Sequence, residues 1–76
     1  MMASIGGENY IRVEEVVSVL PYVARLRRLI KSAEGAYRVW NLSGKRKARS
    51  VIVTNGDMYV SFLSPRTLAR RLRPTA

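Results

Sequence analysis

The sequence contains no cysteine and no histidine. Disulfides are therefore excluded, and the commonest zinc ligands and the Cys–His and Ser–His pairs of nucleophilic enzymes are missing. Glu14 and Glu15 are neighbouring carboxylates, but adjacent residues of a strand point to opposite faces, so they make no acid/base pair. We therefore predict a protein that is not an enzyme and has no catalytic residues, no metal, no cofactor and no small-molecule substrate.

Long apolar segments are also absent. The longest apolar runs span three residues, whereas a bilayer-spanning helix needs about 20. Residues 1–7 show no basic start followed by a hydrophobic block, so the sequence predicts a cytoplasmic protein with no membrane partner. The length of 76 residues and the 47% apolar composition predict one domain over residues 1–76, with residues 73–76 as a tail.

Acidic residues are scarce. Five Asp and Glu stand against fourteen Lys and Arg, giving a net charge of +9, and eleven of the bases are arginine, whose planar fork suits phosphate. Residues 1–20 hold one base against three acids, while residues 21–76 hold thirteen bases against two. This asymmetry predicts a basic face for a polyanion. A domain this small also often depends on oligomerisation, so we expect a homo-oligomer.

The residue pattern predicts an α+β fold, with a small antiparallel sheet of about five short strands, one central amphipathic helix and a short C-terminal helix. Strands are expected over residues 9–13, 16–20, 36–42, 49–54 and 58–63, which are rich in β-branched and aromatic residues. The first two are expected to form a hairpin or a bent pair. Asn55-Gly56 predicts a type I′ turn, with positive φ at both residues, between the last two.

The spacing of apolar residues and the capping residues at the segment ends predict two helices. The first is expected to begin at Pro21 and end at Gly35. Its buried stripe comprises Tyr22, Val23, Leu26, Leu29, Ile30 and Ala33, its opposite face carries Arg27, Arg28 and Lys31, and Arg25 lies on its flank. The second is expected to begin with Ser64 as N-cap and Pro65 as first residue, to bury Leu68 and Leu72, and to stop at Pro74.

The densest basic cluster lies in the loop between the strands expected at 36–42 and 49–54. Lys45, Arg46, Lys47 and Arg49 are expected at a hairpin tip, where phosphates would relieve their mutual repulsion and release counterions. A plain solvated loop is the other interpretation. Auxiliary DNA-binding candidates are the bases of the two helices, for which solvation and the helix dipole are alternatives: Arg25, Arg27, Arg28, Arg70, Arg71 and Arg73.

The aromatic residues Tyr37, Trp40, Tyr59 and Phe62 have two interpretations. They belong to the core or a subunit interface, because so short a chain needs aromatic burial. Alternatively, Tyr37, Trp40 and Tyr59 stack on unpaired bases, in an RNA- or ribosome-associated protein. Gly6-Gly7 lacks the Lys and Ser/Thr of a phosphate-binding loop and predicts a turn or a bulge.

The order of motifs resembles the RemA/RemB family of bacterial extracellular-matrix regulators over residues 5–72. The resemblance rests on Ile5-Gly6-Gly7-Glu8-Asn9-Tyr10-Ile11, the Leu26-Arg27-Arg28-Leu29-Ile30 helix, Gly44-Lys45-Arg46, Ser50-Val51-Ile52-Val53-Thr54 and the segment from Ser61 through Ser64-Pro65 to Leu72. Gly6-Gly7-Glu8 is closer to the RemB branch. Glu15 replaces an arginine found in RemA members, and Arg66 replaces a glutamate of many members.

The resemblance implies a double-stranded DNA-binding transcription regulator that activates biofilm-matrix operons. It implies an α+β subunit similar to LytTR-type DNA-binding domains, assembled in ring-like oligomers. The family's consecutive basic residues after the loop glycine, implicated in DNA binding, fall on Lys45 and Arg46.

Overall fold

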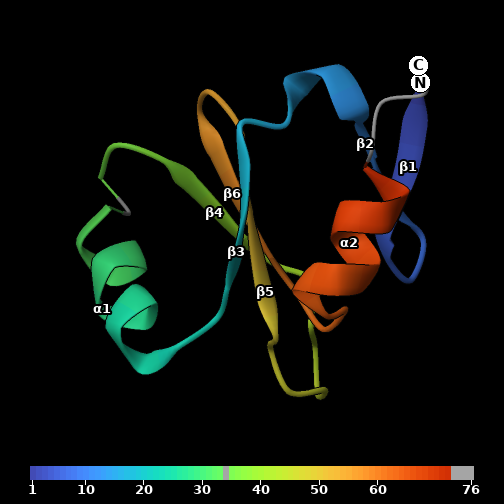
Figure 1. Ribbon diagram of the computed structural model, residues 1–76. Coiled ribbons are helices and arrows are strands. Elements are labelled where there is room, and N and C mark those ends of the chain that lie inside the picture. The colour runs from blue at the N-terminus through green and yellow to red at the C-terminus, as the bar shows by residue number, and fades with distance from the viewer. Residues whose placement is uncertain (34, 73–76) are drawn as a thin grey trace.

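The computed structural model describes residues 1–33 and 35–72. Within these residues the chain forms six strands, two α-helices and one short 3-10 helix, η1 (Figure 1). In chain order they are β1 (Met2–Gly6), β2 (Asn9–Arg12), η1 (Val13–Glu15), β3 (Ser18–Pro21), α1 (Ala24–Ala33), β4 (Arg38–Asn41), β5 (Ser50–Val53), β6 (Asp57–Ser61) and α2 (Pro65–Arg71).

The α+β class is confirmed, but the strands form two sheets instead of one. β1 and β2 pair with each other, and the remaining four strands follow the order β3-β5-β6-β4. The β3–β5 and β5–β6 pairs are antiparallel, whereas β4 runs parallel to β6, with Val39 opposite Met58 and Trp40 opposite Tyr59. The prediction of a purely antiparallel sheet of about five strands was therefore wrong.

The predicted pairing of residues 9–13 with residues 16–20 is also wrong. β2 pairs instead with β1, a strand that the sequence pattern did not indicate, and β3 pairs with β5. Gly6, at the register shift with φ 137°, and Gly7, with φ 58°, form the connection, so the predicted turn or bulge is confirmed. Glu14 and Glu15 lie in η1 and not on a strand.

The β5–β6 hairpin is confirmed, but its turn is not type I′. Neither Asn55 nor Gly56 has positive φ. The Thr54 backbone N–H donates to the Asp57 carbonyl at 2.9 Å, and the Thr54 hydroxyl oxygen accepts from the Asp57 N–H at 3.1 Å. The Asp57 N–H thus bonds to the Thr54 side chain and not to the Thr54 carbonyl. With the turn closed in this way, Asn55 and Gly56 do not need the positive φ of a type I′ turn.

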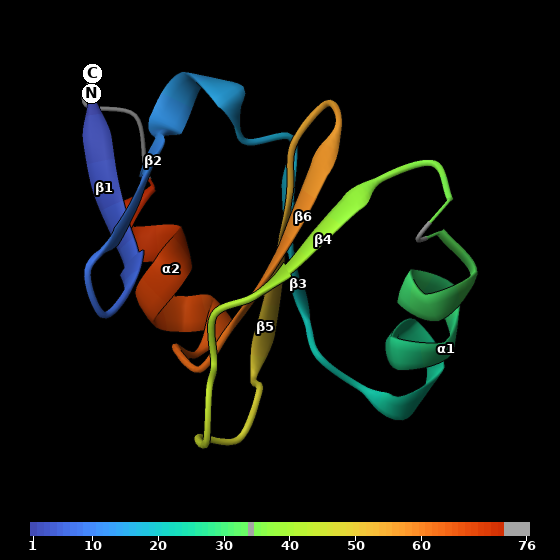
Figure 2. The ribbon, with the colours of Figure 1, turned by 180° about the vertical axis from the view of Figure 1, so that it is seen from behind.

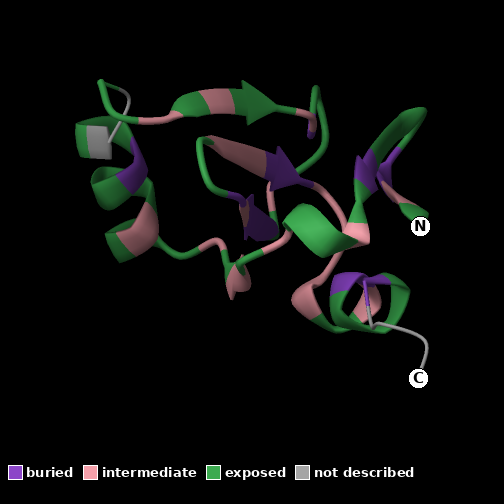
Figure 3. Ribbon diagram, turned by 90° about the horizontal axis from the view of Figure 1, so that it is seen from above, coloured by how far each residue is buried: buried purple, intermediate pink, exposed green. Residues whose placement is uncertain are grey.

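Three layers cross the molecule, with the four-stranded sheet in the middle (Figures 1 and 2). On one side, α2 and the β1–β2 hairpin cover a core of Ile5, Ile11, Ile52, Leu68 and Leu72. On the other side, α1 contributes Ile30 to a smaller core with Val51 and Val60. Figure 3 shows the buried residues of both helices turned toward the strands between them.

A buried serine ties the β1–β2 hairpin to the sheet. The hydroxyl of Ser61, which has no solvent exposure, donates to the Ile5 carbonyl at 2.6 Å and accepts from the Leu63 N–H at 3.1 Å. Ser50, equally buried, donates to the Leu63 carbonyl at 2.6 Å. The end of β6 is therefore fixed by side-chain hydrogen bonds that hold segments far apart in the sequence.

Both helices differ in detail from the sequence pattern. Pro21 ends β3 opposite Ser50, so α1 begins three residues later than predicted; proline is tolerated there because β3 is an edge strand. Leu29 is 59% exposed and Val23 52%, so the predicted buried stripe is too wide. For α2, the Ser64 cap, Pro65 at its start and the burial of Leu68 and Leu72 are confirmed. The predicted stop at Pro74 lies outside the described residues.

Neither α1 nor α2, nor any other helical segment within residues 1–33 and 35–72, is long and apolar enough to cross a bilayer.

Candidate nucleic-acid interface

The densest basic cluster lies on a crossover and not at a hairpin tip. Because β6 separates β4 from β5, the chain between these strands passes across the end of β6. We call residues 43–49 the basic crossover. Its charged side chains are Lys45, Arg46, Lys47 and Arg49, and all four are exposed. The predicted hairpin loop was wrong because β4 takes the parallel position beside β6, which local sequence does not reveal.

The entry to the basic crossover is fixed by a compact turn. The Asn41 side-chain oxygen accepts from the Ser43 N–H at 3.0 Å and from the Ser43 hydroxyl at 2.6 Å. Gly44 adopts a φ of +60°, and the Arg46 N–H donates to the Ser43 carbonyl at 3.0 Å. A side chain at Gly44 would meet no atom, so its left-handed backbone explains the glycine.

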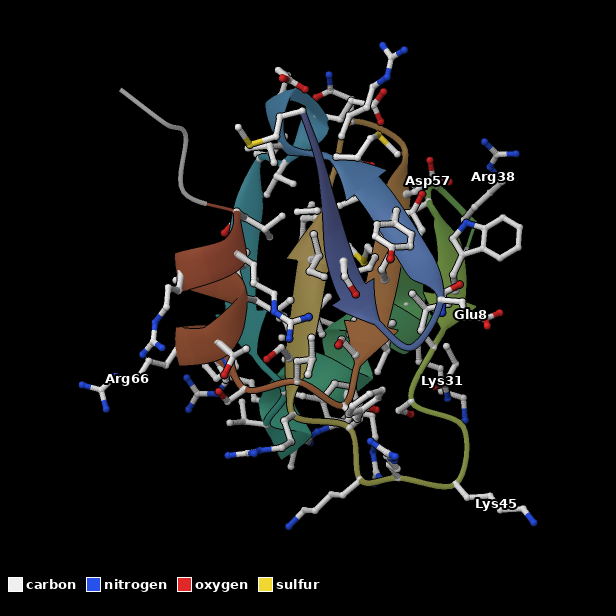
Figure 4. All side chains as sticks on the ribbon, turned by 90° about the vertical axis from the view of Figure 1, so that its right-hand side faces the viewer. Glu8, Lys31, Arg38, Lys45, Asp57 and Arg66 are labelled. Atoms are coloured by element: carbon white, nitrogen blue, oxygen red, sulfur yellow. The ribbon has the colours of Figure 1, made fainter. Side chains whose placement is uncertain are left out.

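The exit of the basic crossover is fixed by Arg49. Its N–H donates to the Ser61 carbonyl at 2.9 Å, and its carbonyl accepts from the Tyr22 N–H at 3.0 Å. The backbone of this basic segment is therefore anchored at both ends, while its four basic side chains are exposed. Figure 4 shows Lys45 extending into solvent at the end of the molecule where β6 terminates.

Arg46 is held by an aromatic ring. Its guanidinium carbon lies 4.4 Å from the centroid of the Phe62 ring, within the range of a cation–π interaction. The Phe62 ring also lies close to the β1–β2 hairpin, since a Cβ at Gly6 would be 3.2 Å from it. Phe62 therefore neighbours both this hairpin and Arg46. The spacing along the chain gave no sign of this stack.

The auxiliary basic residues lie on three different surfaces. Arg25 and Arg28 are exposed on α1, whereas Arg27 lines a cleft between α1 and β4. Arg70 and Arg71 are exposed on the last turn of α2, and one Arg71 guanidinium N–H donates to the Ser4 carbonyl at 3.4 Å. The auxiliary bases are therefore divided between two helices and a cleft. Arg73 lies outside the described residues.

Arg66 is a basic residue that the sequence interpretation did not include among its candidates. It occupies the first turn of α2 and is exposed. In Figure 4, Arg66 and Lys45 extend from the same end of the molecule, on opposite sides of it. Arg66 could have been found from the sequence because it directly follows the Ser64-Pro65 cap. The start of α2 lies at the end of the sheet where β6 stops, so the residue after the cap lies there too.

Acidic charge is concentrated at the opposite end. η1 carries Glu14 and Glu15 and lies far from the basic crossover (Figure 1). The N-terminal ammonium donates to Glu14 at 2.8 Å, and this hydrogen bond lowers the pKa of the Glu14 carboxyl, with a smaller contribution from a backbone hydrogen bond. Charge is therefore separated along the molecule, which orients it toward a polyanion.

The aromatic residues are divided between core and surface. Tyr59 packs against the larger core, and burial, followed by the charge of Asp57, raises the pKa of its phenol. Trp40 is 47% exposed, and its indole N–H donates to the Asp57 carboxylate at 3.3 Å. The same carboxylate accepts from Arg38 at 3.0 Å. The core interpretation therefore fits Tyr59 but not Trp40.

No group of three or more Asp or Glu side chains within the described residues could hold a metal ion.

The chain matches the family described as extracellular matrix regulatory protein A-like, RemA-like, over residues 2–72. The chain belongs to the RemA-like family. It is 35% identical over 75 residues to a candidate regulatory protein of Thermosynechococcus vestitus, covering 96% of this chain and 97% of that one. It is 29% identical over 73 residues to another from Brevibacillus brevis, covering 93% and 85%. These names describe regulatory proteins and not enzymes, and the resemblance read from the sequence is confirmed.

Proposed function

We propose that this RemA-like protein is an oligomeric, non-enzymatic transcription regulator that binds double-stranded DNA through the basic crossover. One observation carries the proposal: four bases within five residues are exposed on a backbone anchored at both ends. A fixed backbone lowers the entropy lost when these side chains meet phosphates, and each neutralised phosphate releases counterions. Arg66 and the bases of α1 and α2 act as auxiliary contacts. The control of biofilm-matrix operons, which the family resemblance implies, belongs to this proposal, and the family description names an extracellular matrix regulatory protein.

Self-association is the second part of the proposal. Seven large apolar residues are exposed within the described chain: Met1, Met2, Tyr10, Val17, Val23, Leu29 and Trp40. β3 and β4 are both edge strands of the four-stranded sheet. Such edges and apolar side chains favour contact with further copies, and a repeated basic crossover would raise affinity by avidity. A ring-like assembly and a likeness to LytTR-type domains stay predictions.

The test is the salt dependence of binding to duplex DNA. In Lys45→Ala/Arg46→Ala, the slope of log affinity against log salt is expected to fall by about 0.9 for each phosphate that is no longer neutralised, on nearly any sequence. Because both side chains are exposed, the free energy of unfolding should change by only about 0.5 kcal/mol. Fluorescence anisotropy at several salt concentrations measures the first effect, and thermal melting measures the second.

Arg70→Ala/Arg71→Ala is the comparison variant: it removes two exposed bases that the proposal treats as auxiliary, so it should weaken binding less than the crossover variant does. If this variant loses affinity and slope while the crossover variant binds normally, the DNA site lies on α2 and the proposal for the basic crossover is wrong.

Native mass measurement with and without duplex DNA tests oligomer and ligand together. We expect an assembly well above the 8.6 kDa monomer that gains mass with DNA. A stable monomer at micromolar concentration that ignores DNA contradicts the proposal. Competition between duplex DNA and single-stranded RNA tests the alternative of an RNA-associated protein, in which the exposed indole of Trp40 would stack on bases.

A further inference from the structure

A cleft of about 730 Å³ lies between α1 and β4. It exists because α1 reaches the sheet mainly through Ile30 and the half-buried Leu26, and does not lie flat on the sheet. Its volume falls within the range of about 300–1,000 Å³ typical of small-molecule sites. The cleft is on the face of the sheet opposite α2, and none of the four bases of the basic crossover lines it.

The floor of the cleft is apolar. Ile30 and Val60 are buried there, and Val39 of β4 is half-buried beside them. Two tyrosines, Tyr22 and Tyr37, also line it. Arg38, Trp40 and Asn41 of β4 complete the lining, and the Asp57 carboxylate accepts hydrogen bonds from Arg38 and from Trp40.

Three cations line the cleft: Arg27 and Lys31 of α1, and Arg38 of β4, whose guanidinium is paired with Asp57. Arg27 and Lys31 are four residues apart, which places them one above the other on the same side of the helix. Both side chains are exposed beside the apolar floor, and Figure 4 shows Lys31 extending outward at the edge of the molecule. The sequence pattern assigns them to the solvent face opposite the buried stripe. In the structure they line the same cleft as the buried Ile30.

This combination selects a particular chemistry. A lone phosphate would leave the apolar floor and the tyrosine rings without a partner, and a purely apolar ligand would desolvate Arg27 and Lys31 without compensation. A DNA duplex is too wide to enter. The geometry points to a binding site for a nucleoside phosphate, with the planar base on the tyrosine-lined apolar wall and the phosphate at Arg27 and Lys31. A free mononucleotide and an unpaired nucleotide within a single strand share this chemistry.

The test is a calorimetric titration with ATP, GTP, CTP and UTP, with adenosine and inorganic tripolyphosphate as part-ligands. We expect at least one nucleoside triphosphate to bind more tightly than either part-ligand, because base and phosphate contact different parts of the cleft. Arg27→Gln/Lys31→Gln and Tyr37→Leu should each weaken this binding about tenfold or more. Arg25→Gln/Arg28→Gln is the matched control on the same helix, and it should bind like the wild type because neither residue lines the cleft.

A single-stranded oligodeoxyadenylate distinguishes the two sources. Competition between ATP and this strand for the same cleft supports a nucleotide site open to both, and binding of the strand alone through Arg27 and Lys31 identifies an unpaired nucleotide as the ligand. Lys45→Gln/Lys47→Gln separates this inference from the proposed DNA function, since it should weaken duplex binding but leave binding to the cleft unchanged.

Three outcomes overturn the inference. The first is that no nucleotide or strand binds at millimolar concentration. The second is that Arg25→Gln/Arg28→Gln weakens binding as much as Arg27→Gln/Lys31→Gln, which would mean general attraction to a basic surface. The third is that the cleft variants lower the native mass without affecting nucleotide binding, which would identify the cleft as a contact between subunits.

Discussion

The two sides of the four-stranded sheet are built differently. On the α2 side, five buried apolar residues from β1, β2, β5 and α2 close one core, and the buried serines at positions 50 and 61 tie its edges together. On the α1 side, one buried helical residue, Ile30, meets Val51 and Val60, and a cleft stays open beside them. The α2 side is sealed, whereas the α1 side is half covered.

This difference between the two sides of the sheet suggests a division of roles: one side stabilises the fold, and the other is open for recognition. The sealed side holds five of the eight buried apolar residues of the two cores, and Phe62 contacts Arg46 of the basic crossover. The open side leaves Arg27 and Lys31 beside an apolar floor that nothing within the described residues covers. A small domain has too little core to close both sides, so the open one is available to a ligand.

The largest expected effect is the loss of core packing on the sealed side. Leu68→Ala removes a side chain with no solvent exposure and should cost about 2–5 kcal/mol of unfolding free energy. Ile30→Ala should cost less, about 2 kcal/mol, because the cleft beside it lets neighbouring side chains and water fill the space. Denaturant titration of both variants measures the difference. Equal losses would show that the two sides contribute equally and would break the comparison.

A smaller effect is expected where the sealed side meets the basic crossover. Phe62→Leu keeps an apolar side chain but removes the ring beneath Arg46, so that guanidinium loses its fixed position. An exposed cation–π contact is worth about 0.5–1 kcal/mol, so affinity for duplex DNA should fall about two- to fivefold. Phe62→Tyr keeps a ring and should bind like the wild type. If both variants bind DNA normally, Phe62 does not position Arg46 for binding.

The smallest effect concerns the acidic end of the sealed side. The hydrogen bond from the N-terminal ammonium lowers the pKa of Glu14 in the folded chain, so the pair stabilises the fold above the unfolded pKa, about 4.5. This contribution is lost as pH falls through the lowered folded value. Melting temperatures of the wild type and Glu14→Gln should differ slightly at neutral pH and converge in acid. Glu15→Gln, an exposed neighbour without an ion pair in the described chain, should show no such convergence.

Much of the candidate site could be predicted from local sequence. The clustering of Lys45, Arg46, Lys47 and Arg49 is a property of adjacent residues, and their exposure follows from their charge. The arrangement of these residues could not be predicted. Whether the segment forms a hairpin or a crossover depends on which strand lies beside β5, and that choice is made by packing between residues far apart in the chain.

The same division applies to single side chains. The sequence identifies Arg27 and Lys31 as one helical pair, but only the position of α1 beside β4 decides that they border a cleft and not open solvent. It identifies Phe62 as an aromatic residue for burial, but only the tertiary structure shows that this ring lies beside Gly6 of the other sheet and under the Arg46 guanidinium.

The sequence by itself determined the α+β class, the charge asymmetry, the capped α2 helix, the glycine connection at Gly6-Gly7 and the β5–β6 hairpin. Each of these depends on composition or on interactions between residues close in the chain, and both can be recognised in the sequence pattern. Tertiary structure alone decided the two separate sheets, the parallel β4–β6 pair, the crossover path and the open cleft. These depend on contacts such as Ser61 to Ile5, 56 residues apart, whose formation is governed by which surfaces best exclude water when the whole chain packs.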